Sequence, residues 1–139
     1  MSLIRCDQIE LRIHNRYHTF IKCEKMNDPI FEKLVFYIVN NDPQGFSDSL
    51  NKYPLEIKTK GRKGWTLFHY AAEYQNVSIG KELLSKGADL NAKDDFGNNV
   101  LWRATFSSKG KGEFIQFLIE NGVDKFAKNH SGISPMDLA

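Results

Sequence analysis

The sequence predicts a mostly α-helical solenoid built from tandem two-helix units. Glycines recur with one period, since Gly64, Gly97 and Gly132 are 33 and 35 positions apart, and Gly87 and Gly122 are 35 apart. The stretches around both glycine series also recur, in the same order along the chain. Two glycine series that recur with nearly the same spacing indicate a supersecondary unit that is repeated along the chain and stacked on its neighbours.

Length and composition are consistent with one such domain. The chain has 139 residues, 41% of them hydrophobic and 12% aromatic, so a core can form and a wholly disordered chain is excluded. A net charge of +2 is too close to neutral for a general nucleic-acid binder. The longest apolar run, residues 34–39, is too short to span a bilayer, and two cysteines make no disulfide framework. We therefore expect a cytoplasmic protein without a membrane segment.

Residues 1–27 precede the repeats, and we expect them to form a short N-terminal cap. Apolar side chains alternate over residues 9–13 and again over residues 19–23, which indicates two short strands joined by a turn, a β-hairpin. A helix that uses residues 4, 8 and 11 fits nearly as well. Either element would shield the apolar side of the first unit.

The first unit, residues 28–60, is degenerate. The pairs Asp28-Pro29 and Asp42-Pro43 each supply a helix N-cap and a first-turn proline, so two helices are expected to begin there. At an offset of 33 residues, its apolar positions fall on apolar positions of the next unit: Ile38 on Ala71, Phe46 on Ile79, Leu50 on Leu83 and Ile57 on Leu90.

The second unit, residues 61–93, carries the most specific pattern. Its motif residues are Thr66, Phe68, His69, Ala71, Ala72, Leu83, Leu84, Gly87, Ala88, Asp89 and Asn91. With them the chain resembles the ankyrin-repeat family, whose unit of about 33 residues is a β-turn plus two helices. The resemblance implies about three and a half units, and it makes His69 a structural residue.

The later units depart from this pattern. The third unit, residues 94–128, has two additional residues within 107–112, which we place between its helices. Trp102 stands at the position of His69, where we expect it to disturb the hydrogen bonding that His69 makes between neighbouring repeats. Residues 129–139 form a half-unit, either a natural cap or the end of a shortened chain. Met136 and Leu138 are expected to cover the preceding repeat.

No motif indicates catalysis or a cofactor. The chain has no serine in a G-x-S-x-G elbow and no phosphate loop. Cys6, His14, His18 and Cys23 are potential metal ligands, but their spacing lacks the paired close cysteines of zinc modules. We therefore expect no enzyme activity, no metal, no cofactor and no small-molecule substrate.

The resemblance to ankyrin repeats implies that a protein partner binds the turn tips and the concave face of the first helices. Carried over to this chain, the tip positions are Arg62, Lys63, Trp65, Asp95, Phe96 and Asn98. The positions on the first helices are Tyr70, Glu73, Tyr74, Arg103 and Phe106. Five of these residues are aromatic and are expected to form an exposed row, and Trp, Tyr and Arg dominate interface hot spots.

The identity of the partner stays open between several hypotheses. Short free-standing ankyrin proteins resemble immunity or inhibitor proteins that neutralise a cognate bacterial toxin. The alternative is a scaffold or host-interaction fragment of a longer ankyrin protein. A third is a nucleic-acid-associated module that uses the basic run of residues 58–63, although the overall charge argues against it.

Overall fold

The structure is a computed structural model that describes residues 28–138. Its α-helices are α2 (Pro29–Val39), α3 (Pro43–Lys52), α4 (Leu67–Glu73), α5 (Val77–Ser85), α6 (Val100–Phe106), α7 (Glu113–Glu120) and α8 (Pro135–Leu138). Two short 3₁₀ helices, η1 (Pro54–Lys58) and η2 (Arg62–Gly64), connect α3 to α4. The described residues form no strand, only one isolated antiparallel bridge between Lys93 and Asn99. The expected N-terminal cap and the four candidate metal ligands lie outside this range.

The starts of the first two helices follow from local capping. The Asp28 Oδ1 accepts a hydrogen bond from the backbone N–H of Ile30 (2.8 Å), and the Asp42 Oδ1 accepts one from Gly45 (3.0 Å). A proline follows each aspartate at the first helical position, where no N–H is needed. Both predicted helix starts are confirmed.

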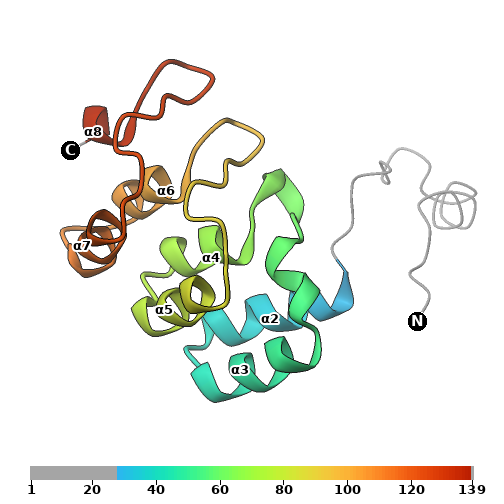
Figure 1. Ribbon diagram of the computed structural model, residues 1–139. Helices are drawn as coiled ribbons and strands as arrows, with labels where there is room; N and C mark the ends of the chain where they lie inside the picture. Colours follow the sequence, from blue (N-terminus) through green and yellow to red (C-terminus); the bar gives the residue numbers. More distant parts are fainter. Residues whose placement is uncertain (1–27, 139) are drawn as a thin grey trace, which may run out of the picture.

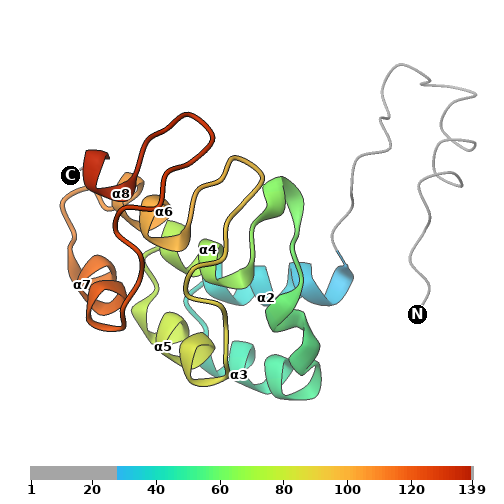
Figure 2. The ribbon, with the colours of Figure 1, turned by 45° about the horizontal axis from the view of Figure 1, so that its top comes forward.

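The helices stack in two layers. The first helices of the successive pairs, α2, α4, α6 and α8, contact one another in one layer, and α3, α5 and α7 form the second (Figure 1). The loops that lead into α4, α6 and α8 stand side by side at one end of the helices (Figure 2). The helix-to-helix turns therefore lie at the opposite end.

One hydrophobic core runs between the two layers. The aligned positions predicted from the 33-residue offset behave alike: Ile38 and Ala71, Phe46 and Ile79, and Leu50 and Leu83 are all buried, and Ile57 and Leu90 are both half-buried. The core continues through α4 and α7, where the Phe68 and Phe114 rings meet edge to face at 6.2 Å. Each unit thus buries its apolar side chains against its neighbours, as stacked repeats require.

Neighbouring loops bond directly to each other. The backbone N–H of Asp95 donates to the carbonyl of Lys63 (2.8 Å), and that of His130 donates to the carbonyl of Phe96 (3.0 Å). Glycine is needed beside both bonds. Gly64 and Gly97 have φ values of +72° and +80°, and a Cβ on either would lie within 3 Å of the next loop's backbone.

The residues at each loop-to-helix junction differ from unit to unit. In the first turn of α4, the His69 side chain bonds to the next loop, as described below. Ahead of α6, the Asn99 side chain accepts from the Trp102 N–H (2.8 Å) and donates to the carbonyl of Asp124 (2.9 Å). Trp102 therefore leaves the bond of His69 intact, and Asn99 supplies the link at its own junction.

The C-terminal helix packs differently from our expectation. Helix α8 contacts α6, but it comprises four residues, and Pro135 is its buried position. Met136 is 47% exposed, so it does not cover the preceding repeat as expected, whereas Leu138 is half-buried. The Asp137 carboxylate accepts from the Ser134 N–H (2.8 Å) and hydroxyl (2.9 Å), and these bonds lower the Asp137 pKa.

Candidate functional site

Exposed hydrophobic side chains concentrate on the layer of first helices. Among residues 28–138, eleven large hydrophobic residues are exposed, and five of them belong to the first helices or their C-caps: Phe36, Val39, Tyr74, Phe106 and Met136. Three more lie on the loops: Phe96, Phe126 and Ile133. The second layer exposes two by the same criterion, Ile119 of α7 and Tyr53, the C-cap of α3, and the remaining one, Leu55, lies in η1.

A cluster around Arg103 lies on the same helices. Its guanidinium carbon is 4.7 Å from the centroid of the Trp65 ring, 5.4 Å from that of Trp102 and 5.3 Å from that of Phe106. The Trp102 and Phe106 rings stack at 5.3 Å with 12° between their planes. The Arg103 Nη1 is 3.4 Å from the Glu73 Oε1, which makes the pair an ion pair. These contacts hold the Phe106 ring over α6 while 63% of the residue stays exposed.

The prediction that Trp65 is exposed is wrong, because only 8% of it reaches solvent. Trp65 precedes Thr66, the N-cap of α4, and packs edge to face on Tyr70 in the first turns of that helix (4.9 Å between centroids). This pairing is a hydrophobic staple, in which Trp65 is buried and Tyr70 is half-buried. Arg103 from the next unit and the Lys63 Nζ, 5.6 Å from the ring centroid, cover the remaining ring.

The prediction that Asn98 is an exposed tip residue is also wrong, since 5% of it is exposed. Its backbone N–H donates to the Asp94 Oδ1 (2.9 Å), and its carbonyl accepts from the His69 Nε2 (3.1 Å). Its side-chain Oδ1 accepts from the Asn129 Nδ2 (2.8 Å). Asn98 therefore joins three successive units.

His69 is a structural group. Its Nε2 donates to a backbone carbonyl, so Nδ1 is the lone-pair nitrogen and accepts from the Thr66 N–H (3.2 Å). Burial lowers the pKa of the imidazole, which keeps it neutral. Both nitrogens are occupied by this arrangement, so His69 is not placed to act as a general base.

The remaining predicted residues do not form one row. Arg62, Lys63, Asp95 and Phe96 are exposed at the loop tips. Trp65, Tyr70, Glu73, Arg103 and Phe106 come together as described above. Tyr74 and Phe96 are exposed, but no ring contact joins either of them to the other aromatic residues in the described range. The expected row of five aromatics is therefore broken at these two positions.

Sequence reasoning missed four exposed or half-exposed residues of this layer. They are Phe36 and Val39 on α2, Trp102 on α6 and Met136 on α8. The 33-residue offset does not reveal them, because Phe36 falls on His69 and Val39 on Ala72, and both of these residues are buried.

The other sequence features take no part in this surface. Within the basic run, the Lys60 Nζ donates to the carbonyl of Lys93 (2.9 Å), which ties the run to the next loop. Within residues 28–138, no three His, Cys, Asp or Glu side chains are grouped to hold a metal ion. In the same range, no helix has the length and apolar character needed to cross a membrane.

Comparison with known proteins decides the family. A model of ankyrin repeats, in three copies, matches residues 21–129. This chain belongs to the ankyrin-repeat family. As an ankyrin-repeat protein it carries the architecture of a protein–protein interaction module, and such repeats are typically non-catalytic.

Its relatives are much longer proteins. The chain is 39% identical over 79 residues to human neurogenic locus notch homolog protein 1, a match that spans 56% of this chain and 3% of the relative. It is 36% identical over 76 residues to an ankyrin repeat protein of Rickettsia felis, which spans 55% of this chain and 20% of the relative. The ankyrin-repeat chain thus matches a small part of each.

Proposed function

We propose that this ankyrin-repeat chain binds a folded protein through the first-helix surface, defined as Phe36, Val39, Tyr74, Phe106 and Met136 together with the Arg103–Glu73 pair. The observation that carries the proposal is the uneven distribution of exposed hydrophobic side chains between the two helix layers. Scattered exposed apolar residues need no explanation, but a concentration on one face is typical of an interaction site.

The first-helix surface is suited to binding because it is already ordered. The Phe106 ring contacts both Trp102 and Arg103, and Arg103 contacts three rings and pairs with Glu73. A partner therefore does not have to immobilise these side chains, which saves about 0.5–1.5 kcal/mol for each. The surface also combines aromatic rings with an arginine, the residue types that contribute most at interfaces.

A capture experiment with matched variants tests the proposal. The double variant Phe36→Ala/Phe106→Ala removes two exposed rings from α2 and α6, and Ile119→Ala removes an exposed side chain from the second layer. Proteins retained from a lysate of the source cells are compared by quantitative mass spectrometry. We expect one protein that the wild type and Ile119→Ala retain and the double variant loses. Equal retention by all three chains would contradict the proposal.

Neutralisation of a cognate toxin is one specific form of such binding, and we keep it as the finer hypothesis. It predicts that co-production of this chain restores the growth of cells that express a toxin encoded beside its gene. The double variant Phe36→Ala/Phe106→Ala should fail to restore growth. Toxicity that persists in the presence of the wild-type chain would reject the inhibitor role and leave the broader proposal in place.

A further inference from the structure

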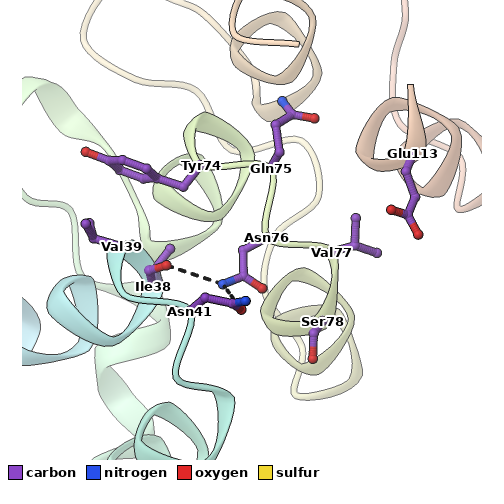
Figure 3. Close-up of a pocket in the computed structure, with 9 residues that line it drawn as sticks. All are labelled: Ile38, Val39, Asn41, Tyr74, Gln75, Asn76, Val77, Ser78 and Glu113. Atoms are coloured by element: carbon purple, nitrogen blue, oxygen red, sulfur yellow. Dashed lines mark hydrogen bonds between the residues drawn. The ribbon is translucent and has the colours of Figure 1, made fainter. Parts of the chain in front are cut away.

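Polar side chains join successive units at both ends of the helices. At the end that carries the helix-to-helix turns, the Asn76 Nδ2 donates to the Ile38 carbonyl (3.3 Å) and to the Asn41 Oδ1 (3.2 Å) (Figure 3). At the loop end, the Asn91 Oδ1 accepts from the backbone N–H of Asp124 (3.0 Å). Each of these bonds pairs a group of one unit with a group of the unit beside it.

The loop-end bond has no counterpart between the first two units. An offset of 33 residues places Lys58 at the position of Asn91, and a lysine side chain has no acceptor. An offset of 35 residues places Asp89 at the position of Asp124. The Asp89 turn is built like its counterpart: the Asp89 Oδ1 accepts from the Asn91 N–H (2.9 Å), and the Asp124 Oδ1 accepts from the Phe126 N–H (2.9 Å). No group among residues 28–138, however, accepts from the Asp89 N–H.

A pocket of about 280 Å³ opens at this junction. Its lining includes Asp89, two cations and three apolar residues, namely Lys58, Lys60, Ile57, Ala88 and Ala92. Ala88 leaves room for the pocket, because the third unit has the larger Val123 at this position, and Val123 is buried. The volume is just below the lower limit of about 300 Å³ for small-molecule sites, which suits one side chain of a polypeptide.

The next junction indicates where the Asp89 N–H points. There the equivalent N–H of Asp124 meets a side chain of the preceding unit, so the Asp89 N–H points toward the first unit. Asp89 is exposed and lines the pocket together with Lys58 of the first unit. An acceptor that enters the pocket therefore meets a backbone donor.

The charges around the pocket favour an anionic acceptor. Lys58 and Lys60 contribute two positive charges, and no carboxylate among the described residues lies within ion-pairing distance of either Nζ. Asp89 supplies the single negative charge among the lining residues, and its Oδ1 already accepts from the Asn91 N–H. A carboxylate can accept from the backbone N–H and pair with a lysine at the same time, and such charge-assisted bonds are the stronger ones.

We propose that the pocket receives the side chain of a glutamate or aspartate of a bound polypeptide, whose carboxylate accepts from the Asp89 N–H and pairs with Lys58. The methylene groups of that side chain contact Ile57 and Ala88. The pocket shares no residue with the first-helix surface, so the inference goes beyond the proposed function and stands apart from it.

The site can be tested with the acidic side chain alone. The ¹⁵N-labelled chain is titrated with N-acetyl-L-glutamate α-amide at constant ionic strength and followed by NMR. We expect saturable shifts at the backbone amides of Ala88, Asp89 and Ala92, with the largest at Asp89. The neutral isostere N-acetyl-L-glutamine amide should bind about tenfold more weakly, because it loses the charge-assisted bonds. Equal binding of the two compounds, or the absence of a saturable shift at Asp89, would overturn the inference.

Variants that copy the next junction assign the effect to this pocket. Lys58→Asn introduces the residue type of Asn91, and Ala88→Val introduces that of Val123 while keeping both lysines. Each should weaken glutamate-amide binding about tenfold, the first by occupying the N–H and the second by filling the pocket. The control Lys81→Asn removes an exposed lysine from α5, outside the pocket, and should bind as the wild type does. Unchanged binding by Lys58→Asn or Ala88→Val, or an equal loss in the control, would contradict the assignment.

The outcome is separable from that of the capture experiment. Phe36→Ala/Phe106→Ala leaves every lining residue of the pocket in place, so it should bind the glutamate amide as the wild type does. Normal glutamate-amide binding without partner capture would therefore reject the proposed function alone.

Discussion

Replacement of Gly64 by alanine should cost far more stability than the same replacement at Gly132. Both glycines have positive φ, +72° and +77°, so both variants incur about 1–2 kcal/mol for a left-handed alanine. At Gly132 no atom lies within 4 Å of the added Cβ. At Gly64 the Cβ would lie 2.7 Å from the backbone nitrogen of Asp95, whose N–H donates to the carbonyl of Lys63.

The additional cost at Gly64 can be assembled from two terms. Displacement of Asp95 breaks a hydrogen bond worth about 1 kcal/mol. Crowding of the two loops adds about 1–3 kcal/mol. Gly64→Ala should therefore lower the free energy of unfolding by about 2–4 kcal/mol more than Gly132→Ala.

Urea unfolding followed by tryptophan fluorescence measures this difference, with unchanged m-values as the check that the unfolded states are comparable. Equal losses in the two variants would refute the reasoning, because the contact between neighbouring loops would then contribute nothing.

Two further predictions concern buried groups. Trp65→Ala should lower the free energy of unfolding by about 3–5 kcal/mol, because it removes a buried ring that packs on Tyr70 and under Arg103. A loss below about 1 kcal/mol would show that the ring is exposed in solution. The pKa of His69 in the folded chain is below its unfolded value of about 6.5, so the unfolded chain binds more protons than the folded one. The free energy of unfolding should therefore fall as the pH drops from 7.5 through 6.5 toward the folded pKa. His69→Gln should show a shallower pH dependence in the same urea titrations, and an unchanged slope would assign the effect to other groups.

The repeat architecture could be predicted from the sequence because its signals are local. Asp28 and Asp42 cap their helices through residues two and three positions away. Gly64 and Gly97 mark turns whose backbone conformation only glycine tolerates at no cost. The spacing of such local signals gives the period, and the period gives the stacking.

The exposure of individual surface residues could not be predicted in the same way. Trp65 is buried partly by Arg103, which lies 38 positions further along the chain and is placed by the next unit. Asn98 is buried because Asn129 and His69, from units on either side, bond to it. Side-chain exposure at a repeat junction depends on these neighbours, and a motif carries no information about them.

The central claim, that the first-helix surface receives a protein, is tested most directly by hydrogen–deuterium exchange of this chain with and without its captured partner. The account predicts slower exchange at the C-terminal ends of α2, α4 and α6, around residues 36–40, 70–74 and 103–107. Slower exchange confined to α3, α5 and α7 would place the partner on the second layer and contradict the account.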